Sequence, residues 1–341
     1  MSLHDSLLLA LESVADVQLM ASLRDERLMF GREDDLRLFI PDLHLISPLA
    51  RKRYRYGTNQ IDLLAQVLGV LQQYRTTENA RGNSVTAYQL GDCLDLWRED
   101  AKERDGFDAA SVITDSNYQV MRRLCSEELK TRFLLGNHDF ELYRRANYST
   151  WARRYFLTQG NQSQHRGVVL HGDLFDWVES FPNEFNRWAV YFLSTSKLAS
   201  DYKVSELSKV VRKENALHDF SRQIAGDAAA GDLLTARSTV PDRFNVTTNH
   251  KFLAPAHQAC HRMNKEYGQQ LRFTVMGHTH QAKISVHDGG KDDFFALIDS
   301  GAWIEDSVLP NGTRFANAQL TALSGNEVRI YQLGPRKAQL S

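Results

Sequence analysis

Five short motifs in this chain combine carboxylate, amide and imidazole side chains, the groups that bind divalent metal ions in proteins. In chain order they are Asp42-Leu43-His44, Gly91-Asp92-Cys93-Leu94-Asp95, Gly136-Asn137-His138-Asp139, His171-Gly172-Asp173 and Gly277-His278-Thr279-His280. Each motif follows a short apolar run typical of a buried strand, which places the polar groups where strands end and loops begin. The five motifs together indicate a two-metal site for the hydrolysis of phosphate esters.

The chemistry of such a site explains why these residue types are needed. Two divalent cations, about 4 Å apart, activate a bridging hydroxide as the nucleophile and neutralise the phosphoryl oxygens. A carboxylate must be shared between two such close cations, and Asp92 is the natural bridge because Gly91 before it allows a close approach of the backbone. Asp42 and His44 are two residues apart, so their side chains leave an extended backbone on the same side and can bind one ion.

The remaining motifs complete the ligand set. His278 and His280 have the same two-residue spacing and can be divided between the two ions, while Asn137 offers an amide oxygen and His171 an imidazole. No thiolate is required, which fits manganese, iron, zinc or magnesium more than copper. Manganese is the metal expected first. The remaining histidines, among them His4, His218, His257 and His261, lack such a context and are expected on the surface or in the core; His250 stays ambiguous.

The segments between the motifs predict a layered α/β architecture. Strands are expected at residues 36–40, 86–90, 131–135, 168–170 and 273–276, each ending at a motif. Residues 61–74 have helical periodicity, and four alternating runs after residue 281 indicate a strand-rich C-terminal half. We therefore expect two facing sheets with helices outside.

The chain is expected to divide into a lead-in, a main domain and an insert. Residues 1–36 would hold an amphipathic N-terminal helix, whose apolar face is formed by Leu7, Leu8, Leu11, Val14 and Ala15. Residues 37–335 would form the catalytic domain, interrupted over 175–250 by a helical insert. The insert is either padding, a contact in a homo-oligomer, or a lid that selects the substrate.

The composition narrows the class of protein. The chain has 341 residues, 42% of them hydrophobic, which is enough for a large core. Its formal net charge of -1 does not favour an extended nucleic-acid surface. Three scattered cysteines suit a reducing compartment, and no apolar run resembles a membrane span or a secretion signal, so a cytoplasmic location is expected.

The ordered motifs resemble those of the calcineurin-like metallophosphoesterase family over roughly residues 37 to 335. The resemblance implies a four-layer α/β/β/α sandwich with a dinuclear centre. It assigns one metal to Asp42, His44, Asp92 and His280, and the other to Asp92, Asn137, His171 and His278. It also implies that His138 contacts the substrate phosphate or protonates the leaving group, and that Asp95 orients His138.

Residues near the motifs are candidates for binding the substrate. They are Arg51, Arg53, Trp97, Arg144 and Arg145. The leading hypothesis is a phosphomonoesterase or phosphodiesterase for small molecules. Some features are similar to the UDP-2,3-diacylglucosamine pyrophosphohydrolases, although those enzymes have Arg at the position of His138. The motifs are also compatible with a nuclease, or with a non-catalytic interaction scaffold built around a metal site.

Overall fold

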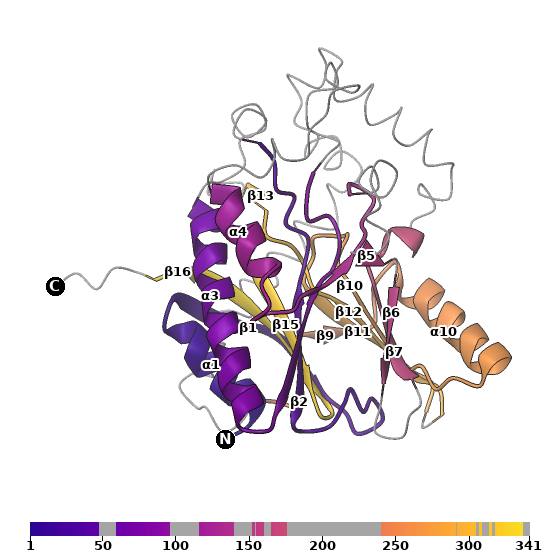
Figure 1. Ribbon diagram of the computed structural model, residues 1–341. Helices are drawn as coiled ribbons and strands as arrows, with labels where there is room; N and C mark the ends of the chain where they lie inside the picture. The colour runs from indigo at the N-terminus through magenta and orange to yellow at the C-terminus, as the bar shows by residue number, and fades with distance from the viewer. Residues whose placement is uncertain are drawn as a thin grey trace, which may run out of the picture.

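The computed structural model describes residues 1–47, 59–95, 116–139, 152–153, 155–159, 165–175, 240–290, 292–304, 307–308, 314–315 and 318–336. Within these residues the chain is a mixed α/β structure with two large mixed sheets and four α-helices (Figure 1). A short ribbon is formed by β13 (Ser307–Val308) and β14 (Arg314–Phe315).

The first sheet has eight strands in the order β5-β4-β3-β2-β15-β16-β1-β8. Neighbours from β5 to β2 are parallel, and the pairs from β2 to β8 are antiparallel. The strands are β1 (Ala15–Arg24), β2 (Asp35–Ile40), β3 (Ser84–Gln89), β4 (Arg132–Leu134), β5 (Ala152–Arg153), β8 (Arg243–Phe244), β15 (Gln319–Ser324) and β16 (Glu327–Pro335).

The second sheet has six strands in the order β6-β7-β10-β12-β11-β9. The three central strands β7, β10 and β12 are mutually parallel. The strands are β6 (Tyr155–Gln159), β7 (His165–Leu170), β9 (Val246–Thr247), β10 (Phe273–Met276), β11 (Lys283–Asp288) and β12 (Phe294–Asp299).

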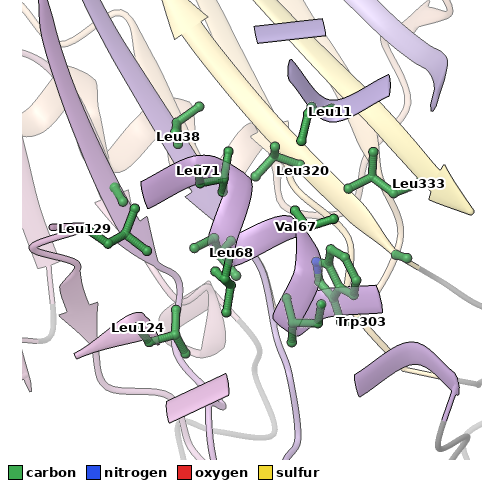
Figure 2. Close-up of a cluster of buried hydrophobic side chains, with 14 of the residues drawn as sticks. Leu11, Leu38, Val67, Leu68, Leu71, Leu124, Leu129, Trp303, Leu320 and Leu333 are labelled. Atoms are coloured by element: carbon green, nitrogen blue, oxygen red, sulfur yellow. The ribbon is translucent and has the colours of Figure 1, made fainter. Parts of the chain in front are cut away.

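The helices cover the outer faces of the sheets. In Figure 1, helices α1 (Leu3–Glu12), α3 (Asn59–Ala80) and α4 (Ser116–Leu124) lie on one side, and α10 (Leu253–Tyr267) lies on the other. One buried cluster packs the first three helices on the first sheet. In Figure 2, Val67, Leu68 and Leu71 of α3 lie close to Leu38 and Leu320 of that sheet.

Two further clusters complete the packing. One contains inward side chains of both sheets, among them Phe39 and Ile330 of the first and Val275 and Ile298 of the second. The other lies between the outer face of the second sheet and α10, where Leu297 and Ala256 are fully buried. Buried apolar side chains therefore fill three interfaces: between the first sheet and its helices, between the two sheets, and between the second sheet and α10.

Most predicted strands are confirmed. All five strands expected before the motifs are present, as β2, β3, β4, β7 and β10, within a few residues of the predicted bounds. The four C-terminal runs contain β11, β12, β15 and β16, and the helical pattern of residues 61–74 lies within α3. The mixed α/β class with two sheets is thus confirmed.

The N-terminal segment differs from its prediction. The helix α1 ends at Glu12, so Val14 and Ala15 do not extend its apolar face, and Ala15 begins the ten-residue strand β1. This strand lies between β16 and β8 inside the first sheet, so the first 36 residues belong to the main body. The cause is tertiary: pairing with β16 along the whole strand outweighs the local helical periodicity.

The predicted helical insert over 175–250 lies mostly outside the described residues. Its described last part, residues 240–250, carries β8 and β9 instead of helix, and these strands extend one edge of each sheet. Among the described helices, none has the length and apolar character that crossing a membrane requires.

Candidate metal centre

The parallel strands bring the five motifs to one edge of each sheet. β2, β3 and β4 run parallel, so Asp42, Asp92 and Asn137 follow their carboxyl ends. β7 and β10 do the same in the second sheet for His171 and His278. The two edges are connected directly, because the backbone N–H of His278 donates to Oδ2 of Asp42 at 2.8 Å.

Backbone conformation turns the ligand side chains inward. His44, Asp92, His278 and His280 all have positive φ angles, of 47°, 49°, 73° and 59°. Such angles are uncommon for residues with a side chain and cost on the order of 1–3 kcal/mol each, so they persist only where the surroundings enforce them. Only three other non-glycine residues of the described part have positive φ angles. More than half of these uncommon conformations therefore occur in the motifs.

Two motif glycines are required by the carboxylates packed against them. A Cβ on Gly277 would lie 2.1 Å from Oδ1 of Asp42, and a Cβ on Gly136 would lie 2.0 Å from Oδ1 of Asp92. No side chain fits at such a distance, so both motifs need glycine for close approach.

The first group of converging ligand atoms comes from Asp42, His44 and His280, whose nitrogen and oxygen atoms lie within 4.8 Å of one another. His44 donates from Nδ1 to Asp95 at 3.1 Å, so its Nε2 carries the lone pair. That Nε2 lies 3.0 Å from Nε2 of His280, and the latter lies 3.3 Å from Oδ2 of Asp42. Two imidazole nitrogens and a carboxylate oxygen thus lie close together.

The second group comes from Asp92, His171 and His278, within the same mutual distance of 4.8 Å. His171 donates from Nδ1 to the carbonyl oxygen of Leu90 at 2.9 Å, which turns its Nε2 toward the other ligand candidates. This Nε2 lies 3.0 Å from Oδ1 of Asn137 and 3.2 Å from Oδ2 of Asp92. An imidazole nitrogen, an amide oxygen and a carboxylate oxygen therefore converge, and these are atoms that can bind a cation.

Asp92 lies between the two groups. Its Oδ1 accepts the backbone N–H of His138 at 2.9 Å, which fixes the carboxylate. Its Oδ2 lies 3.2 Å from Nε2 of His171 and 3.6 Å from Nε2 of His44. One oxygen is therefore within reach of both groups, the position that a bridging ligand needs.

Asp95 connects the first group to His138. It accepts from Nδ1 of His138 at 2.7 Å on one oxygen and from Nδ1 of His44 at 3.1 Å on the other. Asp95 is fully buried, whereas the His138 side chain is 17% exposed. His138 therefore lies at the outer rim of the cluster. Asp95, which holds His138, also fixes the ring of the metal candidate His44.

The charges of the cluster stabilise one another. Burial opposes ionisation of Asp92, yet the imidazoles of His171, His138 and His44 lower the pKa of Asp92 well below its ordinary value. Burial likewise opposes a charge on His171, but Asp92 and Asp42 raise the pKa of His171 well above its ordinary value. The carboxylates thus favour positive charge at this point, as a cation site does.

The ligand set fits divalent metal ions. Asp42, Asp92 and Asp95 are at most 2% exposed, and burying several carboxylates together is costly without compensating cations. The buried Oδ1 of Asp42 has no hydrogen-bond partner. Carboxylate, amide and imidazole atoms match manganese, iron, zinc or magnesium better than copper. An orphaned, buried carboxylate oxygen within this set supports a metal site.

Two supporting residues were not predicted from the sequence. The first is Asp139, which accepts the backbone N–H groups of Cys93 and Leu94 at 3.0 and 2.8 Å and so shapes the loop after Asp92. Burial and the charge of Asp92 raise the pKa of Asp139 to about 7. Its place at the end of the third motif was the signal that the sequence offered.

The second such residue is Asp299, at the end of β12. It is fully buried and accepts from the Thr279 hydroxyl, inside the last motif, and from Nε2 of His250 at 3.2 Å. His250 is thereby a supporting residue rather than a ligand. Asp299 ends an apolar strand, a position like that of the motif residues, and this pattern could have identified it.

The five candidate substrate-binding residues, Arg51, Arg53, Trp97, Arg144 and Arg145, lie outside the described residues. The metal candidates Asp42, His44, Asp92, Asn137, His171, His278 and His280 are all brought together, as are the catalytic candidates His138 and Asp95. No protein-family model matches the chain, and no curated protein matches it either.

Proposed function

We propose that this chain is a dinuclear-metal-dependent hydrolase that acts on phosphomonoesters or phosphodiesters of small molecules. In this proposal the two sheets and their covering helices are the four-layer α/β/β/α sandwich of the metallophosphoesterases. The observation that carries the proposal is the position of Asp92, whose Oδ2 lies 3.2 Å from Nε2 of His171 and 3.6 Å from Nε2 of His44.

Each neighbouring ring has its Nε2 toward that oxygen. Asp95 and the carbonyl of Leu90 occupy the other nitrogen of His44 and of His171, at 3.1 and 2.9 Å. A single imidazole beside a carboxylate is common in proteins, but two rings of fixed orientation around one oxygen are the arrangement of a bridged centre. Asp42, His44, His280 and Asp92 would hold one ion, and Asp92, Asn137, His171 and His278 the other.

Two ions held this way supply an activated water and neutralise the charge of the phosphate oxygens. The protein contributes the positions of its own groups. Asp95 holds the proton on Nδ1 of His138, so proton exchange with a leaving alkoxide falls to Nε2 of that ring. We take the substrate side of the cluster to be next to His138 and His280, whose side chains are each 17% exposed.

The test is hydrolysis of a chromogenic phosphomonoester and a phosphodiester by metal-stripped protein reloaded with manganese. His138→Ala should lower turnover by roughly 10²- to 10⁴-fold, the range for loss of a general acid or base, with two ions per chain retained. His261→Ala is the matched control, since this exposed histidine of α10 belongs to none of the motifs.

Hydrolysis of either ester, lost with His138→Ala and kept with His261→Ala, would support the proposal and identify the ester class. Wild-type protein that binds two ions and cleaves neither ester would contradict it. Loss of metal in His138→Ala would contradict the role given to His138, because a rim residue should not be needed for metal binding.

A further inference from the structure

A second group of metal-binding side chains lies apart from the motifs. His257 of α10, His287 of β11 and Asp293, just before β12, have ligand atoms within 4.8 Å of one another. Nε2 of His257 lies 2.9 Å from one oxygen of Asp293, and Nε2 of His287 lies 3.0 Å from the other. The two rings are stacked with centroids 4.3 Å apart. Three elements of the fold therefore meet in one cluster, called here the peripheral cluster.

The peripheral cluster is at the opposite end of the second sheet from the candidate metal centre. Met276, which precedes the last motif, pairs with Asp299, whereas Asp288, next to His287, pairs with Phe294 at the start of β12. Strands rise about 3.3 Å per residue, so these two ends are separated by roughly 16 Å. The peripheral cluster cannot share ions with the motifs.

The surroundings hold each member in place. His287 follows Val286, whose side chain enters the core between the sheets, so alternation turns His287 to the outer face under α10. His257 packs on the ring of Phe295 at 5.4 Å between centroids. The backbone N–H of Gly289 donates to the carbonyl of Asp293 at 2.9 Å, and a Cβ on Gly289 would lie 2.2 Å from Oδ2 of Asp293.

We propose that His257, His287 and Asp293 form a second, mononuclear site for a divalent cation, for which zinc is the best match. Two imidazoles and one carboxylate are a recurrent three-ligand set for zinc, with water in the fourth position. Imidazole ligands favour zinc over magnesium or calcium, which prefer oxygen atoms only. The bound ion would join α10 to the β11–β12 hairpin.

The test counts zinc per chain after metal-stripped full-length protein is equilibrated with zinc and passed through a desalting column. Asp293→Asn and His287→Gln should each bind one zinc fewer than wild type. Asp292→Asn is the matched control, because Asp292 is the exposed neighbour of Asp293 and the change in charge is the same. Competition with a chromophoric chelator should show that each ligand variant binds this zinc at least about 10-fold more weakly.

Because the result is a difference between variants, it does not depend on how many ions the motif residues bind or on whether the proposed hydrolase activity exists. A second measurement is the melting temperature with and without zinc, which should rise more in wild type than in Asp293→Asn because the ion joins two elements. Equal zinc counts in wild type and both ligand variants would overturn the proposal. So would an equal loss in Asp292→Asn, which would indicate a general effect of charge.

Discussion

The candidate metal centre and the peripheral cluster use the same side-chain chemistry but are built differently. At the centre, His44, Asp92, His278 and His280 all adopt positive φ angles, and the carboxylates are packed against glycine backbone. His257, His287 and Asp293 lie on an ordinary helix, strand and turn without positive φ. The side chain of Asp293 is 50% exposed, whereas that of Asp92 is 2% exposed.

The two regions also differ in whether their carboxylate oxygens have hydrogen-bond partners. Both oxygens of Asp293 accept from histidine rings, but Oδ1 of Asp42 is buried without a hydrogen-bond partner. A buried carboxylate oxygen without a hydrogen bond costs free energy that a bound cation would offset. The comparison teaches that the types of ligand residue alone do not show which of two sites would gain more stability from a bound cation. Backbone strain and the buried oxygen without a hydrogen bond distinguish the candidate centre, whose carboxylates a cation would stabilise, from a cluster whose carboxylate oxygens are already hydrogen-bonded.

The largest expected effect follows from removing the shared ligand. Asp92→Asn keeps the shape of the side chain but replaces the charged oxygen within reach of both groups by an amide, so both ions and all hydrolytic activity should be lost. Metal content by elemental analysis and turnover of the cleaved ester measure this. Asp62→Asn, an exposed carboxylate at the start of α3, is the control. Retention of two ions by Asp92→Asn would show that the groups bind independently.

Substitution of Asp95 should have a smaller effect than substitution of Asp92. Asp95 holds Nδ1 of both His44 and His138, so Asp95→Asn should weaken metal binding by about 10- to 100-fold, the usual cost of losing such a partner, and also lower turnover. In the double variant with His138→Ala, turnover at saturating metal should fall little below that of His138→Ala alone, while the loss of metal affinity persists. Fully additive effects on turnover would mean that Asp95 does not act through His138.

The close approach of backbone and carboxylate gives a third prediction. In Gly277→Ala the new Cβ would lie 2.1 Å from Oδ1 of Asp42, so the loop or the carboxylate must move. We expect a loss of about 1–3 kcal/mol in the free energy of unfolding, the usual cost of overpacking, together with weaker metal binding. Gly334→Ala is the matched control, because its nearest neighbour would be at an ordinary 4.0 Å. Chelator-treated protein unfolded in urea separates the packing effect from metal binding.

Much of this architecture could be predicted from sequence because its signals are local. Apolar runs that end in Asp42, Asp92, Asn137 and His278 identify both the strands and the edges where they stop. The strand β1 could not be predicted in this way. Its first residue, Ala15, continues the helical periodicity of α1, and only pairing with β16 more than 300 positions later determines its conformation.

The side chains of the sites could likewise be predicted from the sequence only in part. The order of the motifs predicts which side chains converge, since parallel strands end at one edge of a sheet. Spacing carries no information on the peripheral cluster, because His257 and Asp293 are 36 positions apart and meet only when α10 packs on the second sheet. The apolar strand β12 marks Asp299 as a candidate in the sequence, but its supporting role follows only from its contacts with Thr279 and His250.

The smallest effect comes from His4, a buried histidine that belongs to neither cluster and must be separated from both in any acid titration. Its Nε2 faces the carbonyl of Glu327 at 3.3 Å, and burial together with the charge of Arg329 lowers the pKa of His4 to about 4 from 6.5. Between these values the unfolded chain binds a proton that the folded chain does not. Stability is therefore fully present above pH 6.5 and decreases as the pH falls toward 4.

The decrease should reach about 2 kcal/mol between neutral pH and about pH 5. His4→Gln, which keeps a donor for the Glu327 carbonyl, should remove most of this slope, while His261→Gln on the exposed face of α10 should leave it unchanged. Urea unfolding of metal-stripped protein at several pH values measures it. An unchanged slope in His4→Gln would show that other titrating groups cause the acid sensitivity.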